Sequence, residues 1–572
     1  MRPKRWLLAS GFLALLAPAE ARAPAPAPTR TPFSVVEASI PQMRTALARH
    51  QVTSRELVQQ YLARIAAYED KFHAALTVNP HALAEADAAD LERAQGHLRG
   101  PLHGIPIALK DNIHTTDMPT TGGALAFDGL MPPYEASLAK NLRAAGAIII
   151  AKTQMTELAN WVAGAPTPMP GNYNGLGGYG YNPYDPRKDP RDGFFDGRPV
   201  MPTGGSSSGT GTTANFWVAN VGTETSGSIL NPANWTMLVG IKPTVGRISR
   251  YGVIPITADQ DTPGPMAKTV TDAAILLGIL EGKTPDPNDP ATTNCARPPR
   301  NDYTQYLKAG ALKNARIGIP RAYFYEPVAA PGEAIAHGGL NPEQMQAMDE
   351  AIAVLKKKGA VIVDPADIPS IVDSTPENNF LNWGICGQAG EARGYDDGCS
   401  IVFKYGMKRD FNTWLASLGL RAPVKSLTEL RQWNESHQDA GAIKYGQSLL
   451  DLSDEMDLTR DRERYEADRA KDIRLAATHG IDEVMKAQRL DALLFPAQTG
   501  AALAARPGYP TIIVPFAKVP NAPTPDFPDG FDAKPAPFGV SFTGMACSEP
   551  KLVALAYAFE QATKRRVPPP AP

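Results

Sequence analysis

The 572-residue sequence lacks the motifs that identify common metal, nucleotide and nucleic-acid binding proteins. Its four cysteines form no CxxC pair, and neither an HExxH motif nor a P-loop occurs, so no metal or organic cofactor is expected. Lysine and arginine number 57 against 59 acidic residues, without a basic block. This balance argues against a nucleic-acid partner.

The sequence has no apolar run of the length that crosses a membrane as a helix. The apolar residues 6–17, interrupted by Ser10 and Gly11, follow three basic residues and precede the small-x-small site Ala19-Glu20-Ala21. We interpret residues 1–23 as a signal peptide and expect export, to the periplasm or outside the cell, without a stable membrane anchor. An uncleaved anchor is the alternative.

Few cysteines are present, but they suffice for disulfides in an exported protein. Cys386 and Cys399 lie close together in a glycine-rich stretch and are the expected pair. Four free thiols are the alternative, because the sequence does not give distances in the fold.

Helix and strand patterns alternate along the chain. Thr53 and Glu56 form a capping box that predicts a helix over 52–68, and alternating apolar residues predict a strand that ends at Lys110. Further helices are expected over 82–94, 137–145, 212–220, 273–280, 343–358, 458–475 and 552–563, and strands over 147–151, 316–319, 360–363, 490–495 and 511–515. We expect one large α/β domain over 34–563, with a central mixed β-sheet flanked by helices, between an Ala/Pro-rich lead-in (24–33) and a Pro-rich tail (564–572).

Two serine- and glycine-rich clusters follow, residues 204–209 (GGSSSG) and 222–229 (GTETSGSI). Glycine lets the backbone approach a substrate closely, and successive N–H groups in such a turn bind an anion. An acyl-transfer enzyme needs these groups around the oxyanion of its tetrahedral intermediate. Either cluster alone fits an ordinary linker; two of them behind a strand-end lysine favour a hydrolase.

A serine nucleophile needs a base, and no histidine lies within or beside either cluster. His103 and His114 flank the strand that ends at Lys110, and we expect a catalytic role for neither. A lysine in a low-dielectric pocket loses its charge easily and can accept a proton near neutral pH. Lys110 is therefore the candidate base, and a solvated strand-end lysine is the alternative.

Several blocks occur in order along the chain: 110–112 (KDN), 204–209, 222–229, 242–246 (KPTVG), 261–266 (DTPGPM), 269–274 (TVTDAA), 491–493, 508–510, 514–515 and 538–563. They resemble the amidase signature family over residues 34–563, least in the middle third. The resemblance implies a hydrolase of carboxylic amides and is nearest to exported peptide amidases.

The resemblance also implies a Ser–cisSer–Lys triad. Ser228 matches the nucleophile, Ser206 the bridging serine after a cis peptide bond, and Lys110 the base. The oxyanion hole would consist of the backbone N–H groups of Thr225, Ser226, Gly227 and Ser228. The candidate substrate-binding residues are Gly204, Gly205 and Tyr181.

Two departures from the family pattern matter. Ser206 and Ser228 are 22 residues apart, slightly closer than usual, and the usual spacing would favour Ser208. We retain Ser206 because it matches the motif itself and a shorter helix over 212–220 would absorb the difference. Leu230 stands where many members carry arginine, which removes one charge near the site.

Three other interpretations compete. Residues 205–209 also fit the G-x-S-x-G nucleophile elbow of an α/β-hydrolase-type esterase using Ser207, but residues 198–203 are a poor strand. Ser137 and Lys140 fit S-x-x-K, without the partner motifs of penicillin-binding proteins. A non-catalytic periplasmic ligand-binding protein would also fit export, but it leaves the two clusters unexplained.

The sequence leaves the substrate and the oligomeric state open. We expect a small-molecule or peptide amide, with C-terminal peptide amides as one candidate. The loop 171–202 and the mixed helical region 370–440 are expected to shape the entrance. The aromatic residues of the loop would line an apolar cleft or pack the loop against its own domain: Tyr173, Tyr179, Tyr181 and Phe194.

Overall fold

The computed structural model describes residues 33–191, 193, 196–204 and 209–570. The predicted signal peptide therefore lies outside the described residues, as do the predictions for Phe194, Gly205, Ser206, Ser207 and Ser208. Within the described ranges, no helix has both the length and the apolar character needed to cross a membrane.

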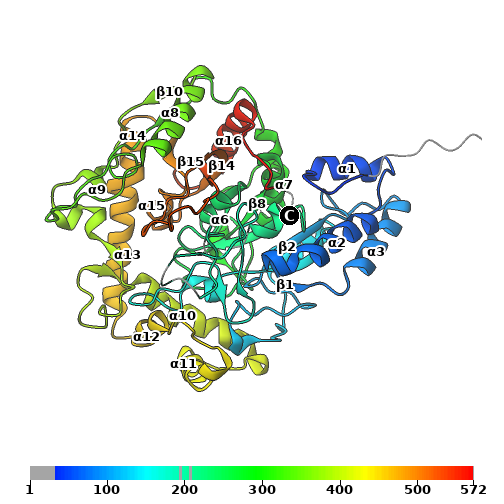
Figure 1. Ribbon diagram of the computed structural model, residues 1–572, viewed down its shortest axis with the longest axis horizontal. Coiled ribbons are helices and arrows are strands. Elements are labelled where there is room, and N and C mark those ends of the chain that lie inside the picture. Colours follow the sequence, from blue (N-terminus) through cyan, green and yellow to red (C-terminus); the bar gives the residue numbers. More distant parts are fainter. Residues whose placement is uncertain (1–32, 192, 194–195, 205–208, 571–572) are drawn as a thin grey trace, which may run out of the picture.

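A mixed sheet of 11 strands forms the centre of the molecule, with helices on both faces and at both ends (Figure 1). The strand order is β1-β3-β2-β6-β8-β7-β14-β15-β13-β9-β10. Strand β2 runs parallel to β3 and β6, whereas β6–β8, β8–β7, β7–β14 and β14–β15 are antiparallel pairs. The strands are β1 (Ala75–Val78), β2 (Pro106–Lys110), β3 (Ile148–Thr153), β6 (Ala219–Glu224), β7 (Val239–Lys242), β8 (Thr262–Ala267), β9 (Arg316–Gly318), β10 (Val361–Val363), β13 (Ala492–Pro496), β14 (Thr511–Val519) and β15 (Ala536–Thr543).

The predicted capping box begins a helix: the Thr53 side chain accepts from the Glu56 backbone N–H, and the Glu56 carboxylate accepts from the Thr53 N–H. Most other predicted helices and strands are also present, with ends that shift by a few residues. The longer helices are α1 (Ile40–Ala48), α2 (Ser54–Phe72), α3 (Ala82–Ala94), α4 (Ser137–Ala144), α7 (Val270–Glu281), α8 (Pro342–Lys357), α10 (Val402–Ser417), α11 (Leu427–Ser436), α12 (Ser448–Asp454), α13 (Arg462–Ile473), α14 (Asp482–Ala487) and α16 (Glu549–Thr563). The expected single α/β domain with a central mixed sheet is confirmed.

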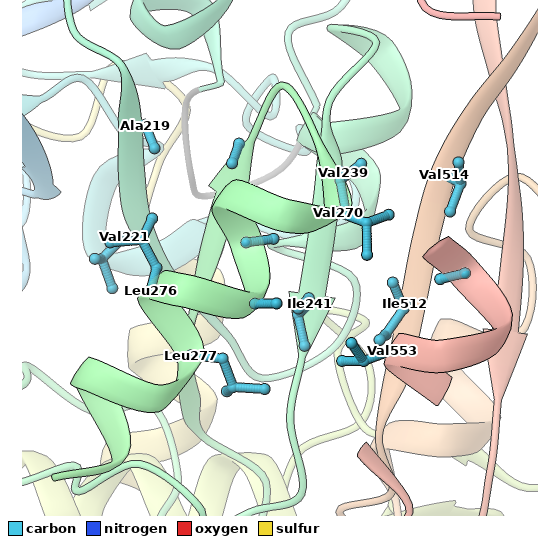
Figure 2. Packing of buried hydrophobic residues seen from close by; sticks show 14 of the residues in the cluster. Ala219, Val221, Val239, Ile241, Val270, Leu276, Leu277, Ile512, Val514 and Val553 are labelled. Atoms are coloured by element: carbon cyan, nitrogen blue, oxygen red, sulfur yellow. The ribbon is translucent and has the colours of Figure 1, made fainter. Parts of the chain in front are cut away.

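The main core lies between the sheet and the helices α7 and α16. Figure 2 shows Val221 of β6, Ile241 of β7 and Ile512 of β14 beside these two helices, and all three side chains are fully buried. Leu276 and Val553 cover them from α7 and α16. Burial of each such side chain contributes about 1.5–3 kcal/mol, so this layer fixes the positions of the central strands.

The predicted helix over 212–220 is wrong. Helix α5 covers only Thr210–Thr213, and Ala219 already begins β6. The chain turns at Asn215, whose φ of 59° is left-handed, and Trp217 folds back so that a Cβ on Gly211 would lie 2.0 Å from its ring. The connection from α5 to β6 is therefore a turn of five residues, 214–218, and contains no long helix.

Two disulfides are present. Cys386 pairs with Cys399, as expected, and Cys295 pairs with Cys547 across 252 residues, a pair that the sequence did not indicate. The long-range bond joins the connection after α7 to the segment before α16 and so links two parts of the main core.

Candidate active site

The candidate base lies at the end of a central strand. Lys110 closes β2, which pairs in parallel with β6 through Leu109 and Val221. This register brings Lys110 next to Thr223 of β6: Lys110 Nζ donates to Thr223 Oγ1 at 2.6 Å and to the Thr223 carbonyl at 3.3 Å. Asn112 also donates to Thr223 Oγ1, at 3.1 Å. Two adjacent strand ends therefore hold the lysine in one place.

Lys110 is fully buried. Burial lowers its pKa to about 7, although the nearby carboxylates Asp261 and Glu224 favour the charged form. An amine with this pKa is neutral in half of the molecules at pH 7 and can accept a proton. The alternative of a solvated strand-end lysine is wrong.

The loop after β6 is held by Glu224. Its Oε2 accepts from the backbone N–H groups of Ile229 and Leu230 at 2.7 and 2.9 Å, which closes residues 225–228 into a compact turn. Gly227 has a φ of 86°, a conformation that a side chain would strain. Ser228 follows, only 9 % exposed, before α6 (Leu230–Trp235). Such a turn presents consecutive N–H groups, as an oxyanion hole requires.

The first Ser/Gly cluster begins against this turn. Gly204 has a φ of 77°, and a Cβ there would lie 2.4 Å from the Pro232 nitrogen and 2.6 Å from the Asn231 carbonyl carbon. Only glycine permits this approach. The start of the 204–209 cluster therefore packs against the first turn of α6, three to four residues after Ser228.

A second carboxylate, Asp261, also holds the turn in place. The Thr225 hydroxyl donates to Asp261, whose other oxygen accepts from the Ile256 N–H at 2.9 Å. Burial raises the pKa of Asp261 to about 7. Gln260 Nε2 adds a bond to the Thr225 carbonyl at 3.2 Å. Sequence reasoning missed these supporting roles, and the DTPGPM block was the signal that could have indicated them.

Leu230, at the position where many members of the family carry arginine, makes apolar contacts instead. It is fully buried in a small cluster that comprises Ile229, Ala233, Leu238, Met266, Ala501 and Ile513. This position therefore packs α6 against β14 and α15 (Ala501–Ala505) and adds no charge to the site.

A cavity of about 780 Å³ opens beside Gly204 and Asn231. The predicted entrance loop supplies part of its wall: Gly171, Asn172, Asp189, Arg191, Arg198, Pro199, Val200 and Pro202. Other parts of the wall come from residues 339–341, 344, 497–499, 519–523 and 536–538. Among the described residues, none from 370–440 lines this cavity, and neither does Tyr181.

The loop aromatics contact the loop itself and its neighbours. The Tyr181 hydroxyl donates to the Gly197 carbonyl at 2.9 Å, and its ring lies edge-on to His73. The Tyr173 ring packs against the rings of Tyr179 and Tyr445, whose hydroxyls are hydrogen-bonded to each other. Lys444 lies 5.0–5.5 Å from these three ring centres. These contacts match the expectation that the aromatics pack the loop onto the domain.

A strained segment, residues 158–160, contacts both the β6 end and the cavity. Leu158, Ala159 and Asn160 have φ values of 41°, 59° and 72°, all left-handed. Each such residue costs about 1–2 kcal/mol and persists only where its surroundings over-determine it. Ala159 lies beside Thr223 and Thr225 in a closed space of about 10 Å³, and Asn160 lines the large cavity. Sequence analysis missed this segment, because strain leaves no pattern in residue type.

The other sequence candidates lie apart from this arrangement. His114 is buried, accepts from Trp414 Nε1 at 2.8 Å, and has its pKa lowered to about 3 by burial, so it stays neutral. His103 contacts the Ala89 carbonyl at 2.9 Å. Ser137 and Lys140 lie in α4, as an ordinary helix turn. Residues 198–203 form no strand, so a nucleophile elbow at Ser207 lacks its required support.

Comparison with known proteins gives one consistent result. The family model described as Amidase matches residues 56–553. A probable amidase of Arabidopsis thaliana is 33% identical over 544 residues, covering 94% of this chain and 92% of its own. The native peptide amidase of Stenotrophomonas maltophilia superposes with a TM-score of 0.77 at 33% identity, covering 94% and 99% of the two chains. An amidase family protein from Bacillus anthracis superposes with a TM-score of 0.75 at 28% identity, covering 94% and 92% of the two chains.

Proposed function

The chain belongs to the amidase family and is a hydrolase of amide C–N bonds. We propose that it works through a serine acyl-enzyme formed at Ser228. Ser206 is the bridging serine and Lys110 is the general base. The N–H groups of Thr225, Ser226, Gly227 and Ser228 form the oxyanion hole.

In the first half of the reaction, Ser228 Oγ attacks the amide carbon. Its proton passes to Ser206, whose own proton passes to the neutral Lys110 Nζ. The carbonyl oxygen becomes an oxyanion and accepts hydrogen bonds from the turn at 225–228. When the tetrahedral intermediate collapses, the C–N bond breaks, the leaving nitrogen takes the proton back along the same path, and ammonia or an amine departs.

In the second half, a water molecule attacks the acyl ester. The water gives a proton through Ser206 to Lys110, and the proton returns to Ser228 Oγ as the ester bond breaks. The products are the free acid and the regenerated serine, so no cofactor enters the balance.

The observation that carries this proposal is the buried Lys110, with a pKa of about 7, fixed 2.6 Å from Thr223 at the start of the turn that leads to Ser228. A neutral amine at this position gives a base where no histidine is available. The turn at residues 225–228, with its consecutive N–H groups, and the cavity beside Gly204 and Asn231 supply the other requirements of acyl transfer.

Two finer statements belong to the proposal. C-terminal peptide amides are the proposed substrates, supported by the similarity to a peptide amidase and by a cavity of about 780 Å³ that has room for more than a small aliphatic amide. Export to the periplasm or the medium is supported by the two disulfides, which persist in oxidising compartments.

The test is to trap the acyl-enzyme. Rapid acid quenching during turnover of a peptide amide, followed by peptide mass spectrometry, should find the acyl mass on the peptide that contains Ser228. An acyl group on Ser207, or turnover with no acyl group on any serine, would contradict the mechanism.

A further inference from the structure

Two carboxamide side chains line the large cavity without a hydrogen-bond partner in the described part of the chain: Asn231 and Gln498. Their oxygens, Asn231 Oδ1 and Gln498 Oε1, are buried. A buried acceptor that finds no donor is destabilising. Two of them beside one cavity therefore indicate a ligand rather than a structural role.

Both side chains lie on firmly held backbone. The Asn231 N–H donates to the Gly227 carbonyl at 2.7 Å, and Gly204 packs against the Asn231 carbonyl. Gln498 follows Ala497, whose φ of 45° is left-handed. Ala497 is fixed by bonds from its N–H to Gly539 at 2.9 Å and from the Ser541 hydroxyl to its carbonyl. This strain is maintained by neighbouring strands and points to a functional position.

Both residues also adjoin the proposed nucleophile turn. Asn231 is three residues after Ser228 on the first turn of α6. A Cβ on Gly227 would lie 3.8 Å from Ala501 Cβ, and the Ala501 N–H donates to the Gln498 carbonyl at 2.9 Å. The two carboxamides therefore reach the cavity from elements that contact the same turn.

Two other amides in the cavity wall, Asn172 and Asn234, differ because their side chains are already hydrogen-bonded. Asn172 Nδ2 donates to the Gly180 carbonyl at 2.5 Å, and Asn234 Oδ1 accepts from the Gly539 N–H at 2.7 Å. These two hold the wall together. Asn231 and Gln498 retain both their donors and their acceptors, and the broad terminal torsion of a carboxamide lets it turn towards a ligand.

We propose that Asn231 and Gln498 are specificity-determining residues that bind a second amide group in the acyl part of the substrate. A carboxamide offers one acceptor and two donors, which complement the N–H and C=O of a peptide group. The preferred substrates are then N-acylated amino-acid amides and peptide amides, above simple alkyl or aryl amides. This inference rests on the proposed amide hydrolysis.

Three primary amides with the same phenylpropanoyl skeleton test the substrate side on the unaltered protein, with ammonia release as the readout. They are N-acetylphenylalaninamide, its isosteric depsi analogue with an ester oxygen in place of the acetamide N–H, and 3-phenylpropanamide, which lacks the acetylated group altogether. Loss of one matched hydrogen bond should lower kcat/KM by about 10-fold in the depsi analogue. The simple amide should be poorer still. Equal kcat/KM for all three would overturn the inference and leave amide hydrolysis intact, whereas no ammonia from any of them would overturn both.

Two variants, one in α6 and one in the turn between β13 and α15, test the residues. Asn231→Ala and Gln498→Ala should each lower kcat/KM for N-acetylphenylalaninamide by about 10-fold and change that for 3-phenylpropanamide by less than about twofold. Gln305→Ala, an exposed residue of η5 (Tyr303–Tyr306), is the matched control and should change neither. Thermal unfolding verifies that each variant is folded. If both variants are folded and each lowers kcat/KM equally for the two substrates, the residues do not recognise the second amide.

Discussion

Two buried lysines lie on neighbouring strands, and they differ in what surrounds the amine. Lys110 ends β2. Lys152 lies on β3, where it pairs in register with Leu109 of β2. Lys152 Nζ lies 3.3 Å from Asp111 Oδ1 and donates to Thr120 Oγ1 at 2.7 Å. The contacts that the structure describes for Lys110 are with the hydroxyl and carbonyl oxygens of Thr223.

The comparison shows that two buried lysines of one sheet can have different roles, one in stability and one in catalysis. Burial lowers the pKa of both lysines, but Asp111 lies against Lys152 and favours its charged form. Lys152 therefore belongs to a buried ion pair, while Lys110, with a pKa of about 7, can exchange a proton near neutral pH. Burial alone identifies neither role, because the partner decides it.

The largest expected effect concerns the nucleophile that Lys110 serves. Ser228→Ala should lower kcat by at least about 10⁴-fold, because it removes the hydroxyl that forms the acyl bond in the proposed mechanism. The thermal unfolding midpoint should stay close to that of the unaltered protein, since the change removes one hydroxyl. Activity measured by ammonia release that survives in this variant would refute the assignment.

The two lysines should respond differently to the same substitution. Lys110→Met should lower kcat by about 10³-fold or more while leaving the protein folded, because it removes the base and a costly buried amine. Lys152→Met leaves Asp111 buried without its partner and should cost about 3–5 kcal/mol of unfolding free energy. Denaturant titration and steady-state kinetics on both variants separate the effects.

A further measurement sharpens the role of Lys110. The double variant Lys110→Met/Ser206→Ala should be little worse than the poorer single variant, because both changes interrupt one proton path. If the two losses multiply, Ser206 and Lys110 do not act as a unit. If Lys152→Met loses activity while it remains stable, the contrast between the lysines is wrong.

The fold and the candidate residues could be predicted from the sequence to different extents. Long amphipathic helices such as α2 and α8, and the strand that ends at Lys110, follow from local pattern and capping. The helix over 212–220 could not be corrected in advance, because the turn at Asn215 depends on the packing of Trp217 against Gly211. Strands β7 and β15 carry little alternation, since they are buried on both faces.

The residues of the candidate site could likewise be predicted only in part. Lys110 and the turn ending at Ser228 were recognised from spacing and resemblance. The bond from Thr225 to Asp261 joins residues 36 positions apart. The strain at residues 158–160 and the lack of partners for Asn231 and Gln498 likewise depend on how distant segments are arranged in the fold. Single-sequence reasoning has no access to such contacts, because residue type does not encode a partner.

The pH dependence distinguishes an exchangeable amine from a fixed ion pair. Lys110 is neutral above its pKa of about 7 and charged below it, so kcat/KM should fall as pH drops, by about tenfold at pH 6 relative to the plateau. Asp261→Asn removes a negative charge that favours the charged amine, so this fall should move to lower pH. A fall that stays in place or moves upwards would contradict the proposed base.

The smallest expected effects concern the two serines next to the bridging position. Ser207→Ala should leave kcat and KM within about twofold of the unaltered protein, because the proton path uses Ser206 and residues 198–203 form no strand that could support an elbow. Ser208→Ala should be similarly mild. The spacing of 22 residues between Ser206 and Ser228 makes the second variant the sharper control, since the usual family spacing would favour Ser208. If Ser208→Ala lowers kcat severely and Ser206→Ala proves mild, the bridging serine is Ser208, while Lys110 and Ser228 keep their roles. If Ser207→Ala alone abolishes activity and Ser228→Ala spares it, the nucleophile is Ser207, and the contrast between the two lysines has no bearing on catalysis.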